Sequence, residues 1–156
     1  YIAGGCFWGM EDLFRKRTGI VDTEVGYQGG ENENPTYRNH PGHAEGIELT
    51  YDANETSFEA ILDYFFRIHN PTTVDQQGND RGSSYRSTVF FQNDEELQSA
   101  KAIIEIVNKS RKWEANTVTT LEAFSPFWKA EPEHQDYLQR NPNGYTCHFE
   151  RHSSFI

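Results

Sequence analysis

Cys6 is the residue of this sequence best placed to do chemistry. It follows Gly4-Gly5, which close an expected short strand, and it precedes a helix expected over residues 9–17. Free backbone N–H groups and the helix dipole at such a position favour a thiolate over a thiol. The alternative is an inert buried thiol, the commonest state of a free cysteine. The aromatic pair Phe7-Trp8 either packs into the core or forms an apolar cup beside the sulfur.

Glu45 is the second residue with a chemical signature. On the strand expected over residues 44–51 it shares a face with Ile47 and Leu49, whereas Glu48 lies on the other face. Burial would raise the pKa of Glu45 and keep its carboxyl group protonated near neutral pH, as a hydrogen-bond donor or general acid. The alternative is a solvated carboxylate at a frayed strand end.

Cys147 is the only other cysteine, and it lies in an irregular tail over residues 141–156. A tail thiol moves more easily than a core thiol, which favours a transient bond to Cys6 over an inert thiol or a permanent disulfide. Cys6 and Glu45 would supply one nucleophilic sulfur and one neutral acid. Cys147 would then be a resolving cysteine for an oxidised Cys6.

Other polar residues become informative only if the fold brings them together. The polar stretch 70–84 is long for a structureless loop, and its low charge predicts an ordered one in which Asp80 supports a site or caps a turn. The polar aromatic residues of interest are Tyr37, His134, Tyr137 and Tyr145. Four further histidines are His40, His43, His148 and His152. No second pair of ligands accompanies them at a recognisable spacing, so we expect no metal site and no cofactor.

The expected elements alternate in a recognisable order. Hydrophobic periodicity, caps and turn residues predict strands over 1–3, 20–27, 44–51 and 85–91, an edge strand over 118–121, and helices over 9–17, 58–69, 94–111 and 133–140. A capping box of Thr56 and Glu59 begins the second helix. The inward positions of the third helix are Leu97, Ala100, Ile104 and Val107. The order predicts an α+β fold, a ferredoxin-like split βαβ core with helices on a mostly antiparallel, mixed sheet.

Length and composition narrow the class of protein. The chain has 156 residues, 24 acidic against 14 basic side chains and a net charge of −10, which predicts a single domain over 1–156 that binds neither nucleic acid nor anionic lipid. With 11 Phe, 8 Tyr and 3 Trp, the core should be rich in rings. No apolar run approaches the roughly 20 residues of a membrane helix. We expect a cytoplasmic protein. Because Tyr1 is not a Met, a targeting segment could precede the given sequence.

The run Gly4-Gly5-Cys6-Phe7-Trp8-Gly9 resembles the active-site signature of the A-type peptide methionine sulfoxide reductases. Further blocks of that family follow in order: Gly26-Tyr27-Gln28-Gly29-Gly30, Asn34-Pro35-Thr36-Tyr37, Gly42-His43-Ala44-Glu45, Gln77-Gly78-Asn79-Asp80-Arg81-Gly82, Tyr85-Arg86-Ser87 and His134-Gln135-Asp136-Tyr137-Leu138. The resemblance covers nearly the whole chain, from Ala3 to His148. Several motifs in order are far more specific than any one of them.

This resemblance implies a role for each candidate residue. Cys6 would attack the sulfoxide sulfur while Phe7 and Trp8 hold the methyl group. Glu45, Tyr37 and Tyr85 would bind the oxygen, with Glu45 as proton donor. The residues implied to support the pocket are Asp80, His134, Tyr137 and Tyr145. The implied products are methionine, from the S epimer of the sulfoxide, and a sulfenic acid that a second cysteine converts to a disulfide reduced by thioredoxin.

Two features of the sequence depart from many members of that family. The segment between Tyr37 and His43 is short and lacks a cysteine, and the tail carries one cysteine where others carry two. We therefore expect one Cys6–Cys147 disulfide that is presented directly to the reductant.

Two other functions fit the residues alone. A cysteine hydrolase would need a histidine within reach of Cys6 and would turn over an ester without reductant. A non-catalytic ferredoxin-like binding module would carry two incidental thiols that iodoacetamide alkylates equally slowly.

Overall fold

The computed structural model describes residues 1–156 and contains one six-stranded sheet of order β7-β6-β1-β3-β2-β8. Its strands are β1 (Ile2–Gly4), β2 (Ile20–Gln28), β3 (Ala44–Tyr51), β6 (Ser87–Phe91), β7 (Thr120–Ala123) and β8 (Trp128–Lys129). Neighbouring strands run antiparallel except β6 and β7, which are parallel. The predicted α+β class with a mostly antiparallel, mixed sheet is confirmed, and the finer ferredoxin-like assignment stays a prediction.

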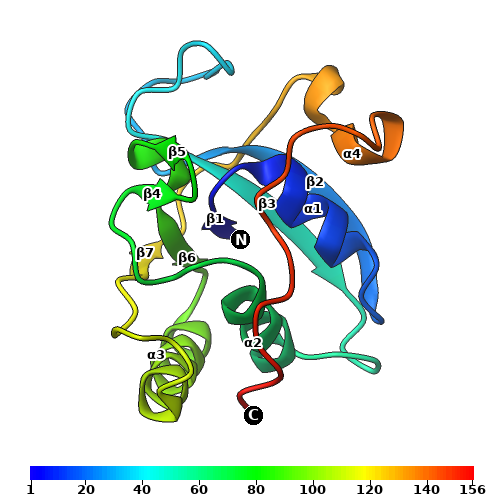
Figure 1. Ribbon diagram of the computed structural model, residues 1–156. Helices are drawn as coiled ribbons and strands as arrows, with labels where there is room; N and C mark the ends of the chain where they lie inside the picture. The colour runs from blue at the N-terminus through cyan, green and yellow to red at the C-terminus, as the bar shows by residue number, and fades with distance from the viewer.

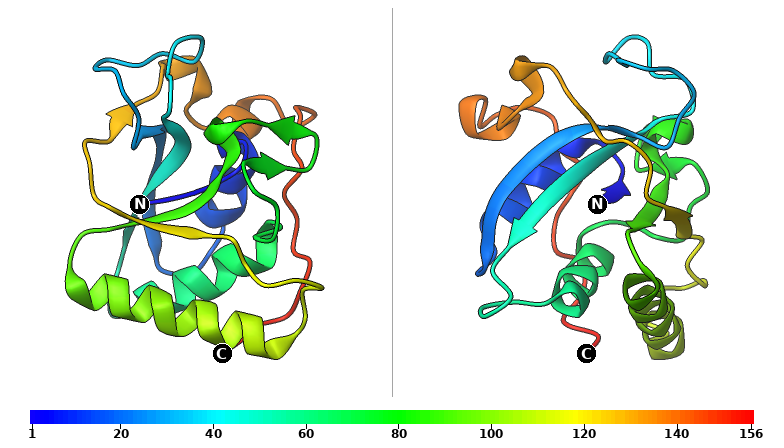
Figure 2. Two further views of the ribbon diagram at one scale, coloured as in Figure 1. Left: turned by 90° about the vertical axis from the view of Figure 1, so that its left-hand side faces the viewer. Right: turned by 180° about the vertical axis from the view of Figure 1, so that it is seen from behind.

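The helices accompany this sheet as Figures 1 and 2 show. They are α1 (Phe7–Arg15), α2 (Phe58–Ile68), α3 (Asp94–Ser110) and α4 (Tyr137–Arg140), with single 3₁₀ turns at Ser83–Tyr85 and Pro132–His134. α1 lies against β2 and β3, and α2 and α3 lie side by side below the sheet. The polar stretch after α2 folds into a small hairpin of β4 (Gln76–Gln77) and β5 (Asp80–Arg81).

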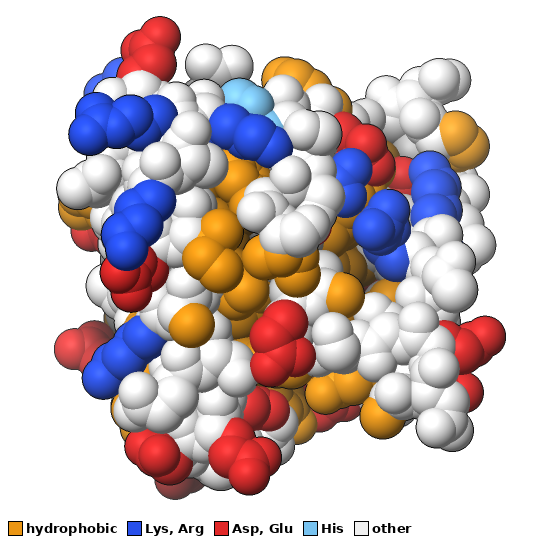
Figure 3. Space-filling model, turned by 90° about the horizontal axis from the view of Figure 1, so that it is seen from below, with side chains coloured by type: hydrophobic (Ala, Val, Ile, Leu, Met, Phe, Trp, Pro, Cys, Tyr) orange, Lys and Arg blue, Asp and Glu red, His pale blue; other side chains and the backbone are white.

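One core of 18 buried residues joins the sheet to α1, α2 and α3. Rings dominate it as the composition predicts, because Phe7, Phe65, Phe66 and Tyr27 are all fully buried. Figure 3 shows the lower face of the molecule, where hydrophobic side chains fill the middle and charged side chains surround them. No helix combines the length and the apolar character that crossing a membrane requires.

The first helix begins two residues earlier than predicted. It starts at Phe7 with Cys6 as the N-cap residue, and Gly9 lies inside the helix instead of before it. The buried carboxylate of Glu11 in this helix accepts hydrogen bonds from Thr23 Oγ1 at 2.8 Å and from the backbone N–H of Asp136 at 2.9 Å. The sequence predicted that the helix begins at Gly9 because glycine is a poor helix former. In the structure Gly9 lies within the helix, where another segment packs against it.

Three further predictions about the helices were wrong in detail. Ser57, not Thr56, caps α2, since its side chain accepts a hydrogen bond from the N–H of Ala60 at 3.1 Å. In α3 Ile103 is a buried position that the prediction missed, while Ile104 is half-buried against the core and Leu97 is only half-buried. The helix predicted over 133–140 is broken by Asp136, whose φ of 53° is left-handed, into a 3₁₀ turn and α4.

The C-terminal segment after α4 runs past α1 and down alongside α2 (Figure 1). Arg151 fastens it, because its guanidinium group donates to the carbonyl of Ile68 at 2.7 Å and to that of Cys147 at 2.9 Å. Further along, Asp63 of α2 accepts hydrogen bonds from the backbone N–H of Phe155 at 2.6 Å and from Ser154 Oγ at 3.0 Å. The segment lacks helix and strand, as predicted, but it is bound to the core.

Candidate active site

Cys6 lies at the junction of β1 and α1, where the chain turns sharply. Gly5 makes this turn with a φ of 100°, a conformation that disfavours any residue with a side chain. The Cys6 side chain is 6% exposed and its thiol is free. Burial raises the pKa of Cys6, the charge of Glu45 raises it further, and the backbone N–H of Trp8 lowers it by less. The prediction that the helix terminus favours a thiolate was therefore wrong for the resting protein, because desolvation outweighs the helix dipole.

Glu45 is the second residue of β3 and is 2% exposed, as its position on the apolar face of the strand predicts. Its Oε1 accepts a hydrogen bond from the backbone N–H of Phe7 at 3.2 Å, at the first turn of α1. Burial raises the pKa of Glu45 to about 8, although the Phe7 N–H lowers it, and the charge of Asp80 raises it further. Glu45 is thus a carboxylic acid at neutral pH, close to the Cys6 segment.

Aromatic rings gather beside Cys6 from segments far apart in the sequence. The indole Nε1–H of Trp8 donates to Nδ1 of His134 at 3.1 Å, and the ring centroids of Trp8 and Tyr137 lie 3.9 Å apart. The ring of Tyr37 stacks on His134 with centroids 4.4 Å apart. Phe7 is fully buried beneath these rings and belongs to the core, whereas Trp8 is only half-buried. The two neighbours of Cys6 therefore differ in access to solvent.

Two tyrosines complete the polar side of the site. Burial raises the pKa of Tyr37 to about 12 and also raises that of Tyr85, and in both cases the charge of Glu45 is the next cause. Both hydroxyl groups stay protonated near neutral pH. They are therefore hydrogen-bond donors within electrostatic reach of Glu45 and Cys6.

Glu131 is a structural partner of this site that the sequence did not reveal. Its carboxylate accepts hydrogen bonds from the Tyr27 hydroxyl at 2.8 Å and from the backbone N–H of Tyr37 at 3.0 Å. It thus ties the loop that carries Tyr37 to β2. Its only sequence signal was its position three residues before His134 in an acidic, Pro-containing run.

Cys147 lies in the C-terminal segment next to the β4–β5 hairpin. A Cβ atom built on Gly78 would lie 3.4 Å from Cys147 Cβ and 3.8 Å from its Sγ, so the thiol lies against the hairpin turn. The hydroxyl of Tyr145 donates to Asp80 at 3.1 Å and fastens the segment to the hairpin. Burial raises the pKa of Cys147, and the charge of Cys147 contributes to the raised pKa of Cys6. The fold thus brings both thiols to one region.

The histidines that a metal site would use do not converge. The ring of His40 contacts the Thr36 carbonyl and Ser84, that of His43 accepts from the Gly30 N–H, and that of His148 contacts the Gly4 carbonyl. His152 packs its ring on Trp113. Ligand atoms of Glu131, Glu133 and His134 do lie within 4.8 Å of one another. Two of these residues already accept hydrogen bonds from other groups. Glu131 accepts from Tyr27 and Tyr37, and His134 accepts from Trp8.

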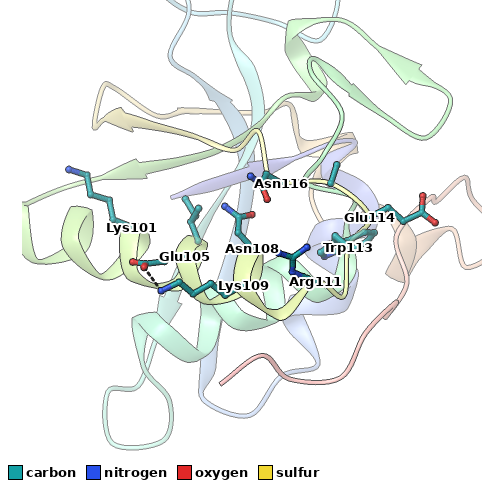
Figure 4. Close-up of a pocket in the computed structure, with 10 residues that line it drawn as sticks. Lys101, Glu105, Asn108, Lys109, Arg111, Trp113, Glu114 and Asn116 are labelled. Carbon is teal, nitrogen blue, oxygen red and sulfur yellow. Dashed lines mark ion pairs between the residues drawn. The ribbon is translucent and has the colours of Figure 1, made fainter.

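A separate cleft of about 810 Å³ lies between the C-terminal half of α3 and the segment that follows it (Figure 4). Charged side chains line it, including the exposed pair of Glu105 and Lys109, whose charged atoms lie 2.6 Å apart. None of the candidate site residues lines this cleft. It is distinct from the region of the two cysteines.

The fold and the site together define a small α+β protein with a buried free thiol and a protonated carboxyl group beside it. The sequence profile of the family described as peptide methionine sulfoxide reductase matches residues 1–155. The chain belongs to this family, and its activity is the reduction of methionine sulfoxide. This membership favours the reductase over the cysteine hydrolase and the non-catalytic binding module.

Relatives and solved structures agree with this assignment. The chain is 57% identical over 150 residues to the peptide methionine sulfoxide reductase MsrA of Nocardia farcinica, covering 96% of this chain and 88% of the relative. It is similar to the crystal structure of Mxr1 from Saccharomyces cerevisiae in reduced form, with a TM-score of 0.90 and 36% identity over 97% of this chain and 90% of that one. It is also similar to the structure of methionine sulfoxide reductase A of Corynebacterium diphtheriae, with a TM-score of 0.86 and 34% identity over 94% of this chain and 76% of that one.

Proposed function

We propose that this chain reduces methionine-S-sulfoxide, free or in proteins, with Cys6 as the nucleophile and Glu45 as the general acid. The observation that carries the proposal is the hydrogen bond from the Phe7 N–H to Glu45, which places a protonated carboxyl group next to the Cys6 segment. A sulfoxide oxygen leaves poorly, so its protonation is the part of the reaction that most needs a catalyst. The residues act within one catalytic domain over 1–156.

In the first step the oxygen moves from substrate to enzyme. The Cys6 sulfur attacks the sulfoxide sulfur while Glu45 protonates the oxygen, and the proton that Glu45 gives is replaced from the Cys6 thiol. The oxygen ends on Cys6 as a sulfenic acid, so that one thiol and one sulfoxide give one sulfenic acid and one thioether. The hydroxyl groups of Tyr37 and Tyr85 hold the oxygen, since both remain donors at neutral pH.

The aromatic side of the site receives the methyl group. Trp8 is half-buried and is held by His134 and Tyr137, while Phe7 forms the buried floor. A methyl site, an oxygen site and a fixed direction of attack make three different contacts around the sulfur. Three such contacts are enough to select the S epimer. Asp80 and Tyr145 support the opposite side of the site, where their mutual hydrogen bond fastens the Cys147 segment.

In the second step Cys147 resolves the sulfenic acid. Its sulfur forms a bond to Cys6 Sγ, and the hydroxyl group leaves with the thiol proton as water. Because the chain has only two cysteines, this disulfide is the one that the reductant must meet. Thioredoxin is the reductant that we propose, and the expected location remains the cytoplasm.

A single-turnover experiment tests this scheme. Reduced protein is mixed with a methionine sulfoxide peptide, and both products are followed by mass spectrometry. We expect the peptide to lose one oxygen while the protein loses two hydrogens through a Cys6–Cys147 disulfide. Cys6→Ser should give no methionine. Cys147→Ser should give one methionine per chain and a sulfenic acid that dimedone traps, but no cycling with thioredoxin. Methionine formation by Cys6→Ser, or normal cycling by Cys147→Ser, would contradict the scheme.

A further inference from the structure

His148 joins the two cysteine-bearing segments by one hydrogen bond. It directly follows Cys147, is 5% exposed, and its Nε2 lies 2.7 Å from the carbonyl oxygen of Gly4, two residues before Cys6. A carbonyl oxygen only accepts, so Nε2 carries the hydrogen and donates it. This bond connects positions 144 residues apart in the sequence.

This hydrogen bond fixes the tautomer of His148 and thereby the protonation state of its other ring nitrogen, Nδ1. With the hydrogen on Nε2, Nδ1 is unprotonated and lies 3.9 Å from the Cys147 sulfur. Burial lowers the pKa of His148 to about 4, so the ring is neutral at physiological pH. The ring is therefore a fixed neutral donor towards Gly4 rather than a charged partner of either thiol.

The segment around His148 lies in direct contact with α1. A Cβ atom on Gly9 would lie 2.7 Å from His148 Nδ1 and would overlap Thr146 Oγ1. Only a glycine at this position leaves room for the segment. Thr146 Oγ1 in turn accepts a hydrogen bond from the backbone N–H of His148 at 3.1 Å. Cys147 is thus held on both sides by residues that contact the Cys6 loop or its helix.

We propose that His148 is a positioning residue for the resolving step, and that its hydrogen bond to the Gly4 carbonyl holds Cys147 in place to attack the Cys6 sulfenic acid. This inference rests on the proposed function, in which Cys147 is the resolving thiol. His148 does not touch the departing oxygen. It acts through the position of Cys147, and a displacement of about 1 Å between reacting groups can slow a reaction by about 10²-fold.

Two substitutions separate this hydrogen bond from the mere presence of a side chain. In His148→Gln an amide N–H takes the place of Nε2 and can still reach the Gly4 carbonyl. In His148→Asn the amide is too short and occupies the place of Nδ1. His152→Gln is the matched control, since His152 lies in the same segment but packs on Trp113.

The experiment follows methionine release and disulfide formation separately in one turnover with a methionine sulfoxide peptide. We expect all three variants to release methionine at the wild-type rate. His148→Gln and His152→Gln should form the disulfide within a few-fold of the wild-type rate. His148→Asn should form it about 10²-fold more slowly, with a sulfenic acid that dimedone traps.

Several outcomes would overturn the proposal. Disulfide formation at the wild-type rate in His148→Asn would show that the hydrogen bond is not needed. Equal loss of methionine release in His148→Asn and His148→Gln would assign His148 to folding instead. If His148→Asn does not fold, Gly9→Ala supplies the second variant, because its Cβ displaces the same ring; an unchanged disulfide rate there would also refute the proposal. If wild-type protein releases methionine without forming a Cys6–Cys147 disulfide, the proposed function has failed at Cys147 and the inference fails with it.

Discussion

The carboxyl group of Glu45 accepts a hydrogen bond of 3.2 Å from the backbone N–H of Phe7, the residue directly after Cys6. The first residues of β3 and of α1 therefore meet at the point where the thiol leaves the chain. The acid lies on a strand and the nucleophile directly precedes a helix, which fixes their relative position more firmly than long loops would.

The protonation of Glu45 should set the alkaline limit of the first step. Its pKa is about 8, so the fraction of protein with an acid ready to donate falls as the pH rises through 8. We expect the rate of methionine release in a single turnover to fall along the same curve. Glu45→Gln should be slower by about 10²- to 10⁴-fold below pH 8 and should lack this limb.

Glu48→Gln is the matched control for this experiment, since Glu48 is on the same strand but on the opposite face. It should keep the wild-type profile. If Glu45→Gln reduced the sulfoxide at the wild-type rate on both sides of pH 8, the acid would have to be Tyr37 or Tyr85.

The same carboxyl group should make stability depend on pH. The pKa of Glu45 is about 8 in the folded protein and about 4.3 in an unfolded chain. Between these values the folded state binds more protons, so the contribution of Glu45 to stability is full below about pH 4.3 and is lost as the pH rises to 8. Urea unfolding should show Glu45→Gln gaining on wild type by up to about 1.4 kcal/mol per pH unit in this window, then levelling off. A constant difference from pH 5 to pH 9 would mean that Glu45 is ionised throughout.

Trp8 should matter more for the substrate than for the thiol. Trp8→Ala removes a ring held by His134 and Tyr137, and we expect kcat/KM to fall by about 10- to 200-fold, the range for a methyl-sized group in an apolar pocket. Iodoacetamide should alkylate Cys6 in this variant at nearly the wild-type rate. Trp8→Phe keeps a ring without the hydrogen bond to His134, so its kcat/KM should lie between those of the wild type and Trp8→Ala. Equal losses in turnover and alkylation would place Trp8 in the support of the helix instead.

Glu131 should hold the loop that carries Tyr37. Glu131→Ala removes the acceptor of both the Tyr27 hydroxyl and the Tyr37 N–H, so we expect KM for the sulfoxide to rise several-fold and amide exchange to increase across residues 29–43. Glu133→Ala is the control, because Glu133 is exposed and close by. Unchanged exchange in Glu131→Ala would show that the loop is held by other contacts.

The sequence by itself determined the features that depend on local pattern. The run around Cys6, the face of the strand on which Glu45 lies and the α+β order all follow from neighbouring residues and their periodicity. These features were enough to predict a buried acid and a cysteine at the start of a helix. The boundary at Gly9 was misplaced because the packing that makes a glycine acceptable inside a helix comes from residues about 140 positions away.

Only the tertiary structure decided which distant segments meet and which protons stay in place. The contacts of Trp8 with His134 and of His148 with Gly4 depend on how loops and tail pack, and no local pattern encodes that packing. The same holds for Cys6, where the helix terminus visible in the sequence favours a thiolate. Burial raises its pKa instead, because the cost of desolvating a charge depends on everything that surrounds it.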